Sequence, residues 1–207
     1  DMLDVVRHER RLSRTSKRFP KKDTCLAIYS LCVNAQKPLD ETLEQFYPGC
    51  SDWSEELADL FRHYVERKQH CQSLDYDDLL LYWSHLVAED EFAHEIGSWF
   101  DHVLIDEYQD TNLVQDRILH ALKPDGGGVT VVGDDAQSIY SFRAAEVENI
   151  LGFPDRFMPT AKVVTLEQNY RSTQPILDTA NRLIAESERQ YRKNLFSTQD
   201  GGARPQY

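Results

Sequence analysis

The chain has 207 residues, of which 41% are hydrophobic and 28% charged, and its formal net charge is −12. This is the composition of an ordinary soluble globular protein, and the length allows one sizeable core or parts of two domains. No apolar run approaches the roughly 20 residues of a membrane span, and the N-terminus lacks the layout of a signal peptide. We therefore expect a cytoplasmic protein with no membrane partner.

The four cysteines form no CxxC pair. Cysteines spaced like Cys25, Cys32, Cys50 and Cys71 are typical of reduced thiols in a cytosolic protein rather than of a disulfide framework or a zinc site.

The charge is unevenly distributed along the chain. Residues 1–22 carry eight Lys/Arg and three acids, a local charge of +5 (8 − 3), whereas residues 75–107 carry ten acids and no Lys or Arg. The acidic total therefore does not exclude a basic strip that faces DNA. The alternative, a solvated charged helix over residues 1–22, stays open at this stage.

The first hundred residues are predicted to be mostly helical. Helices are expected over residues 2–18, 24–34 and 54–69 and from Asp75 onward, with a loop or short helix over residues 38–53. The 3, 4, 7, 8 spacing predicts a buried face on the third of these helices, formed by Leu57, Leu60, Phe61, Tyr64 and Val65. The helix after Asp75 is expected to have a core of Leu79, Leu80, Tyr82, Trp83, Leu86 and Val87.

The pattern changes after about Gly97, where strands and helices alternate. Strands are expected over residues 102–106, 129–132 and 162–166. Helices are expected over residues 112–122, 145–151 and 173–187. The alternation predicts an α/β fold with a mainly parallel sheet and right-handed crossovers.

Two carboxylates, Asp106 and Glu107, stand at the end of the first predicted strand. Ligands of open α/β sheets bind outside the carboxyl ends of the strands. One acid at that place suits a nucleotide-bound Mg²⁺, and the adjacent one suits orientation of an attacking water. The alternative is that the two acids only cap the following helix.

Three segments carry a more specific signal. They are LIDEYQDTN (104–112, the acid motif), VVGDDAQSIYSFRAA (131–145, the GDD motif) and LEQNYRST (166–173, the NYR motif). Their residues and order closely resemble motifs II, III and IV of the UvrD/Rep/PcrA family of superfamily 1 DNA helicases. The segment LDYDDLL (74–80) is also similar to the stretch before the acid motif in these enzymes.

The resemblance implies a P-loop NTPase (RecA-like) partial parallel sheet with an α-helical N-terminal subdomain. It implies a helical insertion subdomain of the first motor domain at residues 1–97 and the second half of that motor domain at 98–160. Residues 161–207 would then begin the second motor domain.

The resemblance also assigns roles near the nucleotide, with ATP and Mg²⁺ as cofactors. Asp106 would hold Mg²⁺, Glu107 would be the catalytic base, and Gln137 would sense the γ-phosphate. From its chemistry alone, Gln109 is expected to bridge the acid strand to its neighbour, because an amide both donates and accepts. A loop amide that satisfies backbone groups remains an alternative for Gln137.

Further roles follow from the GDD and NYR motifs. By resemblance, Arg143 and Arg171 contact the γ-phosphate from the two motor domains, and Tyr170 stacks on adenine. An aromatic at the position of Phe142 stacks on a DNA base with Tyr140 nearby; such stacking is worth about 1–3 kcal/mol per base. The alternatives are an aromatic pair packed in a core and a surface Tyr-Arg pair.

The sequence departs from the family at Ala136, usually an acid, and at Ala144, usually a glycine. No GxxxxGK[ST] segment occurs, since Gly126–Gly128 is followed by Val129. We therefore expect an interior part of a larger helicase that alone would not hydrolyse ATP efficiently.

The expected function is that of a single-stranded DNA translocase, 3′-to-5′ by resemblance, which couples ATP hydrolysis to duplex unwinding in DNA repair or replication. Its partner would be single-stranded or duplex DNA. Two alternatives stay open: a subunit of a helicase–nuclease, and a non-catalytic DNA-binding or interaction module that retained the motor fold.

Overall fold

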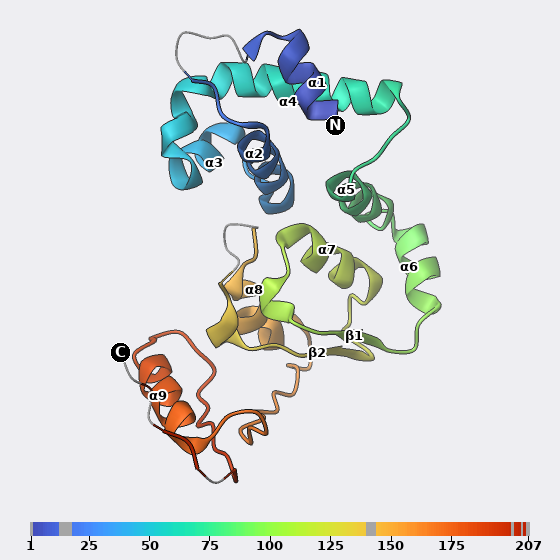
Figure 1. The fold of residues 1–207 in the computed structure, drawn as a ribbon. Coiled ribbons are helices and arrows are strands. Elements are labelled where there is room, and N and C mark those ends of the chain that lie inside the picture. Colours follow the sequence, from blue (N-terminus) through green and yellow to red (C-terminus); the bar gives the residue numbers. More distant parts are fainter. Residues whose placement is uncertain (1, 13–17, 140–143, 200, 204, 206–207) are drawn as a thin grey trace.

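The computed structural model describes residues 2–12, 18–139, 144–199, 201–203 and 205. Across these residues, none of the helices combines the length and apolar character that crossing a membrane requires. In Figure 1 the first four helices, in blue to cyan, lie above a small sheet, and the orange-to-red C-terminal residues lie below it.

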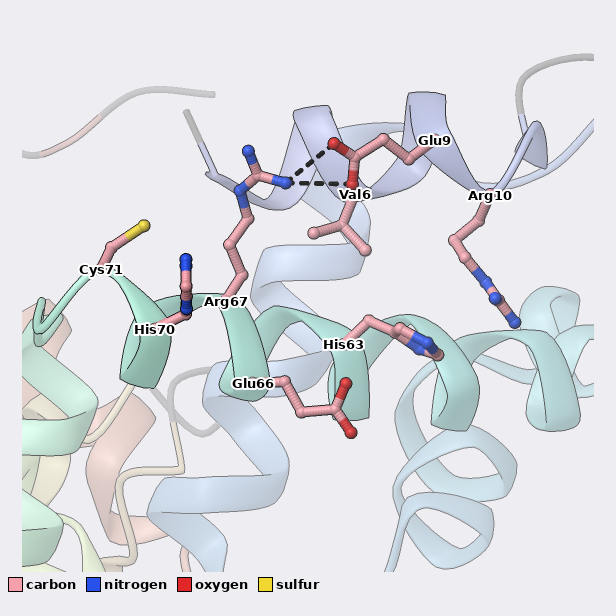
Figure 2. Close-up of a pocket in the computed structure, with 8 residues that line it drawn as sticks. All are labelled: Val6, Glu9, Arg10, His63, Glu66, Arg67, His70 and Cys71. Carbon is pink, nitrogen blue, oxygen red and sulfur yellow. Dashed lines mark hydrogen bonds and ion pairs between the residues drawn. The ribbon is translucent and has the colours of Figure 1, made fainter.

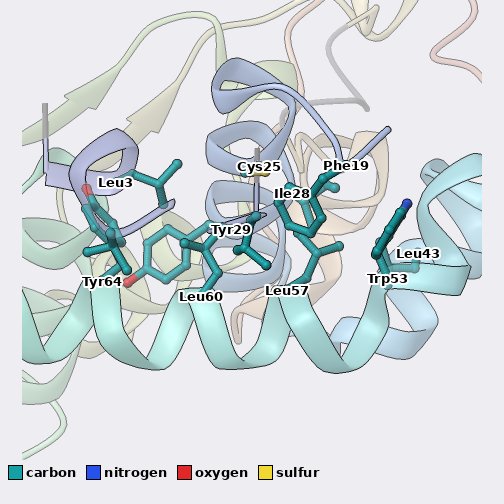
Figure 3. Close-up of a cluster of buried hydrophobic side chains, with 12 residues drawn as sticks. Leu3, Phe19, Cys25, Ile28, Tyr29, Leu43, Trp53, Leu57, Leu60 and Tyr64 are labelled. Carbon is teal, nitrogen blue, oxygen red and sulfur yellow. The ribbon is translucent and has the colours of Figure 1, made fainter. Parts of the chain in front are cut away.

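The first four helices pack around a core of their own. They are α1 (Met2–Glu9), α2 (Lys22–Ala35), α3 (Leu39–Phe46) and α4 (Ser54–His70), with a 3-10 helix at Pro48–Trp53 before α4. The core lies between α4 and the helices above it (Figure 3) and includes Leu3, Phe19, Ile28, Leu43, Leu57 and Leu60.

The predictions for this region are largely confirmed. The helices expected over residues 24–34 and 54–69 are α2 and α4, and residues 38–53 hold α3 and the 3-10 helix. The predicted face of α4 is buried or packed against the core at all five positions. The helix expected over residues 2–18 is shorter, because Arg11 has a φ of 57°, a left-handed conformation that a right-handed helix does not contain.

Helix α5 (Tyr76–Leu86) confirms the helix expected from Asp75 onward, and it begins with a capping box. The Asp75 carboxylate accepts the Asp78 N–H at 2.9 Å, and the Asp78 carboxylate accepts the Asp75 N–H at 3.0 Å. The expected core of this helix is wrong at four positions, since these side chains are exposed: Leu79, Tyr82, Trp83 and Leu86. The apolar contacts of α5 with the described chain are made through Leu80 and through the buried Val87 that follows the helix.

Helices α5 and α6 (Asp90–Ser98) share an apolar cluster with α7 (Leu113–Leu122), not with the core of α1–α4. A capping box starts α7: the Asn112 side chain accepts the Gln115 N–H at 2.9 Å, and the Gln115 side chain accepts the Asn112 N–H at 3.0 Å. The predicted helix over residues 112–122 is thus confirmed.

The sheet consists of two parallel strands, β1 (Val103–Ile105) and β2 (Val129–Val131), whose first, second and third residues are paired. Helix α7 connects them. Helix α8 (Val147–Gly152) and a 3-10 helix (Phe153–Arg156) follow and pack on the sheet. The cluster that joins these elements includes Tyr108, Leu119, Ile150, Phe153 and Phe157.

The third predicted strand, over residues 162–166, is contradicted. These residues adopt no strand in the structure, and Val163, Val164 and Leu166 are exposed. A strand is stable only when a neighbour satisfies its backbone groups. Beyond β1 and β2, the described residues form only isolated β-bridges. The one nearest in sequence to residues 162–166 joins Gln168 to Phe196.

Helix α9 (Gln174–Ala185) confirms the helix predicted over residues 173–187, with Pro175 in its first turn. The fold class is therefore confirmed at the coarser level of a mixed helical protein with a small parallel sheet.

Candidate functional site

The two acids of the acid motif lie at the carboxyl end of β1, as predicted, and both are exposed. The Asp106 carboxylate accepts the N–H of Glu107 at 2.9 Å. Glu107 has a φ of 50°, in the left-handed region, which costs a non-glycine residue about 1–2 kcal/mol. Such strain persists only where surrounding contacts hold it, and it is common at functional sites.

Gln109 supplies the contact that holds this turn. Its amide nitrogen donates to the Glu107 carboxylate at 2.7 Å, and its amide oxygen accepts the backbone N–H of Asp134 at 3.0 Å. The Gln109 side chain is almost fully buried, so its amide depends on these two partners. The predicted bridge between the acid strand and its neighbour is confirmed.

The bridge requires a glycine at position 133. A Cβ placed there would lie 2.5 Å from the Gln109 amide oxygen and 2.7 Å from the Ile150 Cδ1 atom. These are clashes, so Gly133 is what lets the ends of β1 and β2 approach.

Asp134 connects this bridge to Gln137. The Asp134 carboxylate accepts the side-chain amide of Gln137 at 2.8 Å and the N–H of Ala136 at 3.0 Å. It also accepts a hydrogen bond from the ammonium group of Lys193. Burial acts to raise the pKa of Asp134, but the hydrogen bonds from Gln137 and Lys193 outweigh it and hold that pKa below its usual value.

A second buried network supports the acid motif from beneath. Asp116 on α7 accepts hydrogen bonds from the Tyr108 hydroxyl and the Arg156 guanidinium. Asn149 on α8 donates to the Thr111 carbonyl at 3.1 Å. Sequence reasoning missed this network and Lys193, because neither follows a periodic or motif spacing.

The structure does not bring the remaining predicted site residues together with Asp106 and Glu107 within the described chain. Tyr140, Phe142 and Arg143 lie outside the described residues. Tyr170 and Arg171 are exposed, and within the described chain neither forms a hydrogen bond or ion pair with Asp106 or Glu107. The convergence of Arg143 and Arg171 on the γ-phosphate stays a prediction.

Ala144, one of the two departures from the family pattern, is buried and has a φ of 64°. Glycine adopts this conformation without strain and alanine does not. Its methyl group instead packs with Leu31 and Ala35 of α2.

The carboxylates at the end of β1 suit a magnesium ion that arrives with a nucleotide. Within the described residues, no group of three or more His, Cys, Asp or Glu side chains is arranged to hold a metal alone. Mg²⁺ is commonly bound by one or two carboxylates together with phosphate oxygens and water. One oxygen of the Asp106 carboxylate accepts a backbone N–H. A carboxylate oxygen is a ligand that Mg²⁺ prefers, so the other oxygen of Asp106 fits a magnesium ion bound together with a nucleotide.

A cavity of about 440 Å³ lies elsewhere, between α1 and α4 (Figure 2). Arg67, in its wall, donates to both oxygens of Glu9 at 2.8 and 3.0 Å, and Arg10 pairs with Asp59. Both arginines here are thus paired with acids. Whether residues 1–22 face DNA stays a prediction.

Comparison with known proteins identifies the class. The model of the UvrD/REP helicase N-terminal domain matches residues 2–158. The chain therefore belongs to the UvrD/REP helicase family.

Individual relatives match most or all of the chain. The chain is 34% identical over 206 residues to the ATP-dependent DNA helicase PcrA of Staphylococcus epidermidis. The matched residues are 99% of this chain and 27% of that protein. The chain is also 34% identical over 211 residues to PcrA of Bacillus subtilis, covering 100% of this chain and 28% of that protein. A putative ATP-dependent DNA helicase of Bacillus subtilis, YjcD, is 32% identical over 188 residues, 84% of this chain and 25% of the relative. The chain thus spans about a quarter of these relatives' length.

Proposed function

We propose that the chain forms part of an ATP-dependent DNA helicase that binds the phosphates of ATP at the carboxyl ends of β1 and β2. The observation that carries the proposal is the buried Gln109 bridge, which joins Glu107 to the GDD motif. A helix cap needs no such bridge. The names of the relatives, ATP-dependent DNA helicases, support the same reading.

The proposed chemistry is phosphoryl transfer to water. This reaction depends mainly on positioning and on neutralising negative charge. Asp106 would hold Mg²⁺, which supplies charge neutralisation when bound with ATP. Glu107, held by Gln109, would orient the attacking water and take up its proton. Gln137 would sense the γ-phosphate while its amide is held by Asp134.

The remaining roles rest on the family resemblance. Arg143 and Arg171 would contact the γ-phosphate, where a permanently charged, forked guanidinium suits spread phosphoryl charge. Tyr170 would stack on adenine; its exposed ring supports a stacking role. Phe142, with Tyr140, would stack on bases of single-stranded DNA without reading their sequence.

We further propose the domain division at residues 1–97, 98–160 and 161–207, within a P-loop RecA-like fold. The separate core of α1–α4 supports a helical subdomain. Helices α5 and α6 share an apolar cluster with α7, so the proposed boundary at residues 97 and 98 passes through a packed cluster. The 207 residues contain no GxxxxGK[ST] loop, and we propose that another part of the protein supplies it.

The test is DNA-stimulated ATP hydrolysis by the full-length protein and its Glu107→Gln variant. We expect turnover to fall by about 10²–10⁴-fold, the usual contribution of a general base, with ATP affinity retained. The matched control is Glu44→Gln, an exposed acid on α3, which should leave turnover unchanged. Equal turnover in Glu107→Gln and the wild type would remove Glu107 from its role. A wild type without ATPase activity would support a non-catalytic module.

A further inference from the structure

Lys193 belongs to the segment after α9, yet its ammonium group lies on the GDD motif. It pairs with both Asp134 and Asp135, at 3.0 Å in the second case, and its side chain is only 12% exposed. Asp135 is more deeply buried, at 5% exposed. The lysine is therefore the counter-charge for two adjacent acids, 58 or more positions away in the sequence.

The same segment is also fixed by Tyr191, two positions before the lysine. The N–H of Tyr191 donates to the other oxygen of Asp135 at 3.2 Å, and its hydroxyl donates to the Ile150 carbonyl at 3.0 Å. These contacts bind residues 191–193 to the end of β2 and to α8. Lys193 thus occupies a defined place and is not a solvated surface charge.

Asp134 connects Lys193 to the proposed catalytic residues through hydrogen bonds. Its carboxylate accepts the Lys193 ammonium on one oxygen and the Gln137 amide on the other. Its backbone N–H donates to Gln109, which in turn donates to Glu107. One chain of hydrogen bonds therefore runs from the C-terminal segment to both the water-orienting acid and the phosphate sensor.

We propose that Lys193 is a positioning residue: by anchoring Asp134 it holds the Gln137 amide, and through Gln109 the Glu107 carboxylate, in the arrangement that hydrolysis requires. The proposal rests on the proposed function. It makes the geometry at the nucleotide depend on residues 161–207, which the family resemblance places in the other motor domain.

The physical reason is the balance of charge at the end of β2. Without the ammonium group, two adjacent carboxylates stand there unneutralised, one of them buried. Asp134 is then free to turn away from Asp135, and Gln137 loses its acceptor. Both effects act where the negatively charged phosphates of ATP would bind.

The test uses three variants of the full-length protein. Lys193→Met removes the charge, Lys193→Arg keeps it, and Arg189→Met is the matched control. Arg189 also links the C-terminal segment to α8, through an exposed ion pair with Glu148, but it does not touch Asp134. Lys193→Met should lower kcat of the DNA-stimulated ATPase about tenfold, within the coupling expected for residues of one hydrogen-bond network. Lys193→Arg should restore most of the loss, and Arg189→Met should match the wild type.

Combining Lys193→Met with Gln137→Ala separates positioning from simple tethering. Because Lys193 acts through Gln137 as well as through Gln109 and Glu107, adding Lys193→Met to Gln137→Ala should lower kcat clearly less than the same change does in the wild type. Independent, multiplying losses would overturn the proposal, as would equal effects of Lys193→Met and Arg189→Met. A change confined to KM would also overturn it.

Amide hydrogen exchange supplies a readout that does not depend on activity. Lys193→Met, but not Arg189→Met, should accelerate exchange in peptides that cover residues 134–137, because Asp134 accepts the N–H groups of Ala136 and Gln137. If Lys193→Met does not fold, Lys193→Gln replaces it in both measurements. Unchanged exchange refutes the positioning role even where ATPase activity is absent, so its failure is distinct from failure of the proposed function.

Discussion

The side-chain amide of Asn112 donates a hydrogen bond of 2.8 Å to the side-chain oxygen of Asn34, 78 positions earlier in the chain. Both side chains are buried. Asn34 also donates to the Asp77 carboxylate at 2.7 Å, so α2, α5 and the start of α7 meet at one residue. Because Asn112 is the last residue of the acid motif, this contact ties the helical region to the motif that carries Glu107.

Asn34→Ala should destabilise the protein by about 1–3 kcal/mol, because it leaves the buried Asn112 amide without its partner. Thermal unfolding of the variant and the wild type measures this. Glu44→Ala, on an exposed position of α3, is the control and should change little. Unaltered stability in Asn34→Ala would mean that water replaces the lost contact.

Lys68 is the centre of a second cluster between α4 and α5. Its ammonium group lies 2.7 Å from the Asp75 carboxylate and 4.5 Å from the centre of the Tyr64 ring. Lys68→Met leaves Asp75 and Asp78 without a cation, and loss of a buried partner typically costs about 3–5 kcal/mol. We expect the lower end, since Asp75 is partly exposed.

The control for Lys68→Met is Arg62→Met. Arg62 forms an ion pair with Asp59 on the surface of the same helix. Removal of such an exposed pair costs about 1 kcal/mol or less. If the two variants unfold at the same temperature, the Lys68 cluster adds no stability beyond that of a surface pair.

The same cluster predicts a loss of stability in acid. Burial acts to raise the pKa of Asp75, but the hydrogen bond from Lys68 outweighs it and lowers that pKa below its usual value. A carboxyl group whose pKa is lower in the folded state stabilises the fold above its unfolded pKa, about 3.9. That contribution is lost as the pH falls through the lowered folded pKa.

The free energy of unfolding between about pH 5 and about pH 2, the range over which such a carboxyl group loses its charge, tests this. Asp75→Asn should flatten the acid limb of the stability curve relative to the wild type. Curves of identical slope would show that Asp75 titrates alike in the folded and unfolded states.

The local parts of this fold were predictable from sequence, and the contacts between distant segments were not. The starts of α5 and α7, the strands β1 and β2 and the bridging role of Gln109 follow from periodicity, turn chemistry and the two-sided amide. The contact of Lys193 with Asp134 has no such signal, because the residues around this lysine follow no periodic pattern.

Two predictions failed for a related reason. The apolar spacing of α5 correctly predicts a helix, but it does not say whether another element covers Leu79 or Trp83. The run of residues 162–166 has strand-forming composition, yet a strand also needs a hydrogen-bonding neighbour. Periodicity describes one segment, whereas burial and pairing depend on two.

The four cysteines, all free thiols in the structure, should differ in reactivity. Cys25 is fully buried, and burial raises its pKa to about 11, so little nucleophilic thiolate forms at neutral pH. Cys71, at the C-terminal end of α4, is exposed. Maleimide labelling at pH 7, followed by peptide mass spectrometry, should modify Cys71 first and Cys25 only after unfolding. Early labelling of Cys25 would show that the core of α1–α4 opens readily.

Gly133 and Gly152 allow a direct test of the Gln109 bridge, because an added methyl group would clash at Gly133 and not at Gly152. Gly133→Ala places a methyl group 2.5 Å from the Gln109 amide oxygen, so the bridge to Glu107 must shift. Overpacking of this kind costs about 1–3 kcal/mol. Under the proposed function it also lowers ATPase turnover, since Glu107 loses its fixed orientation.

Gly152→Ala is the matched control, because a Cβ at Gly152 meets nothing within 4 Å and its φ of −88° suits alanine. Thermal unfolding and DNA-stimulated ATPase activity are measured on both variants of the full-length protein. We expect Gly133→Ala to lose stability and turnover together and Gly152→Ala to keep both. Should Gly133→Ala retain full turnover, the Gln109 bridge would be a structural tie between β1 and β2 with no part in orienting Glu107.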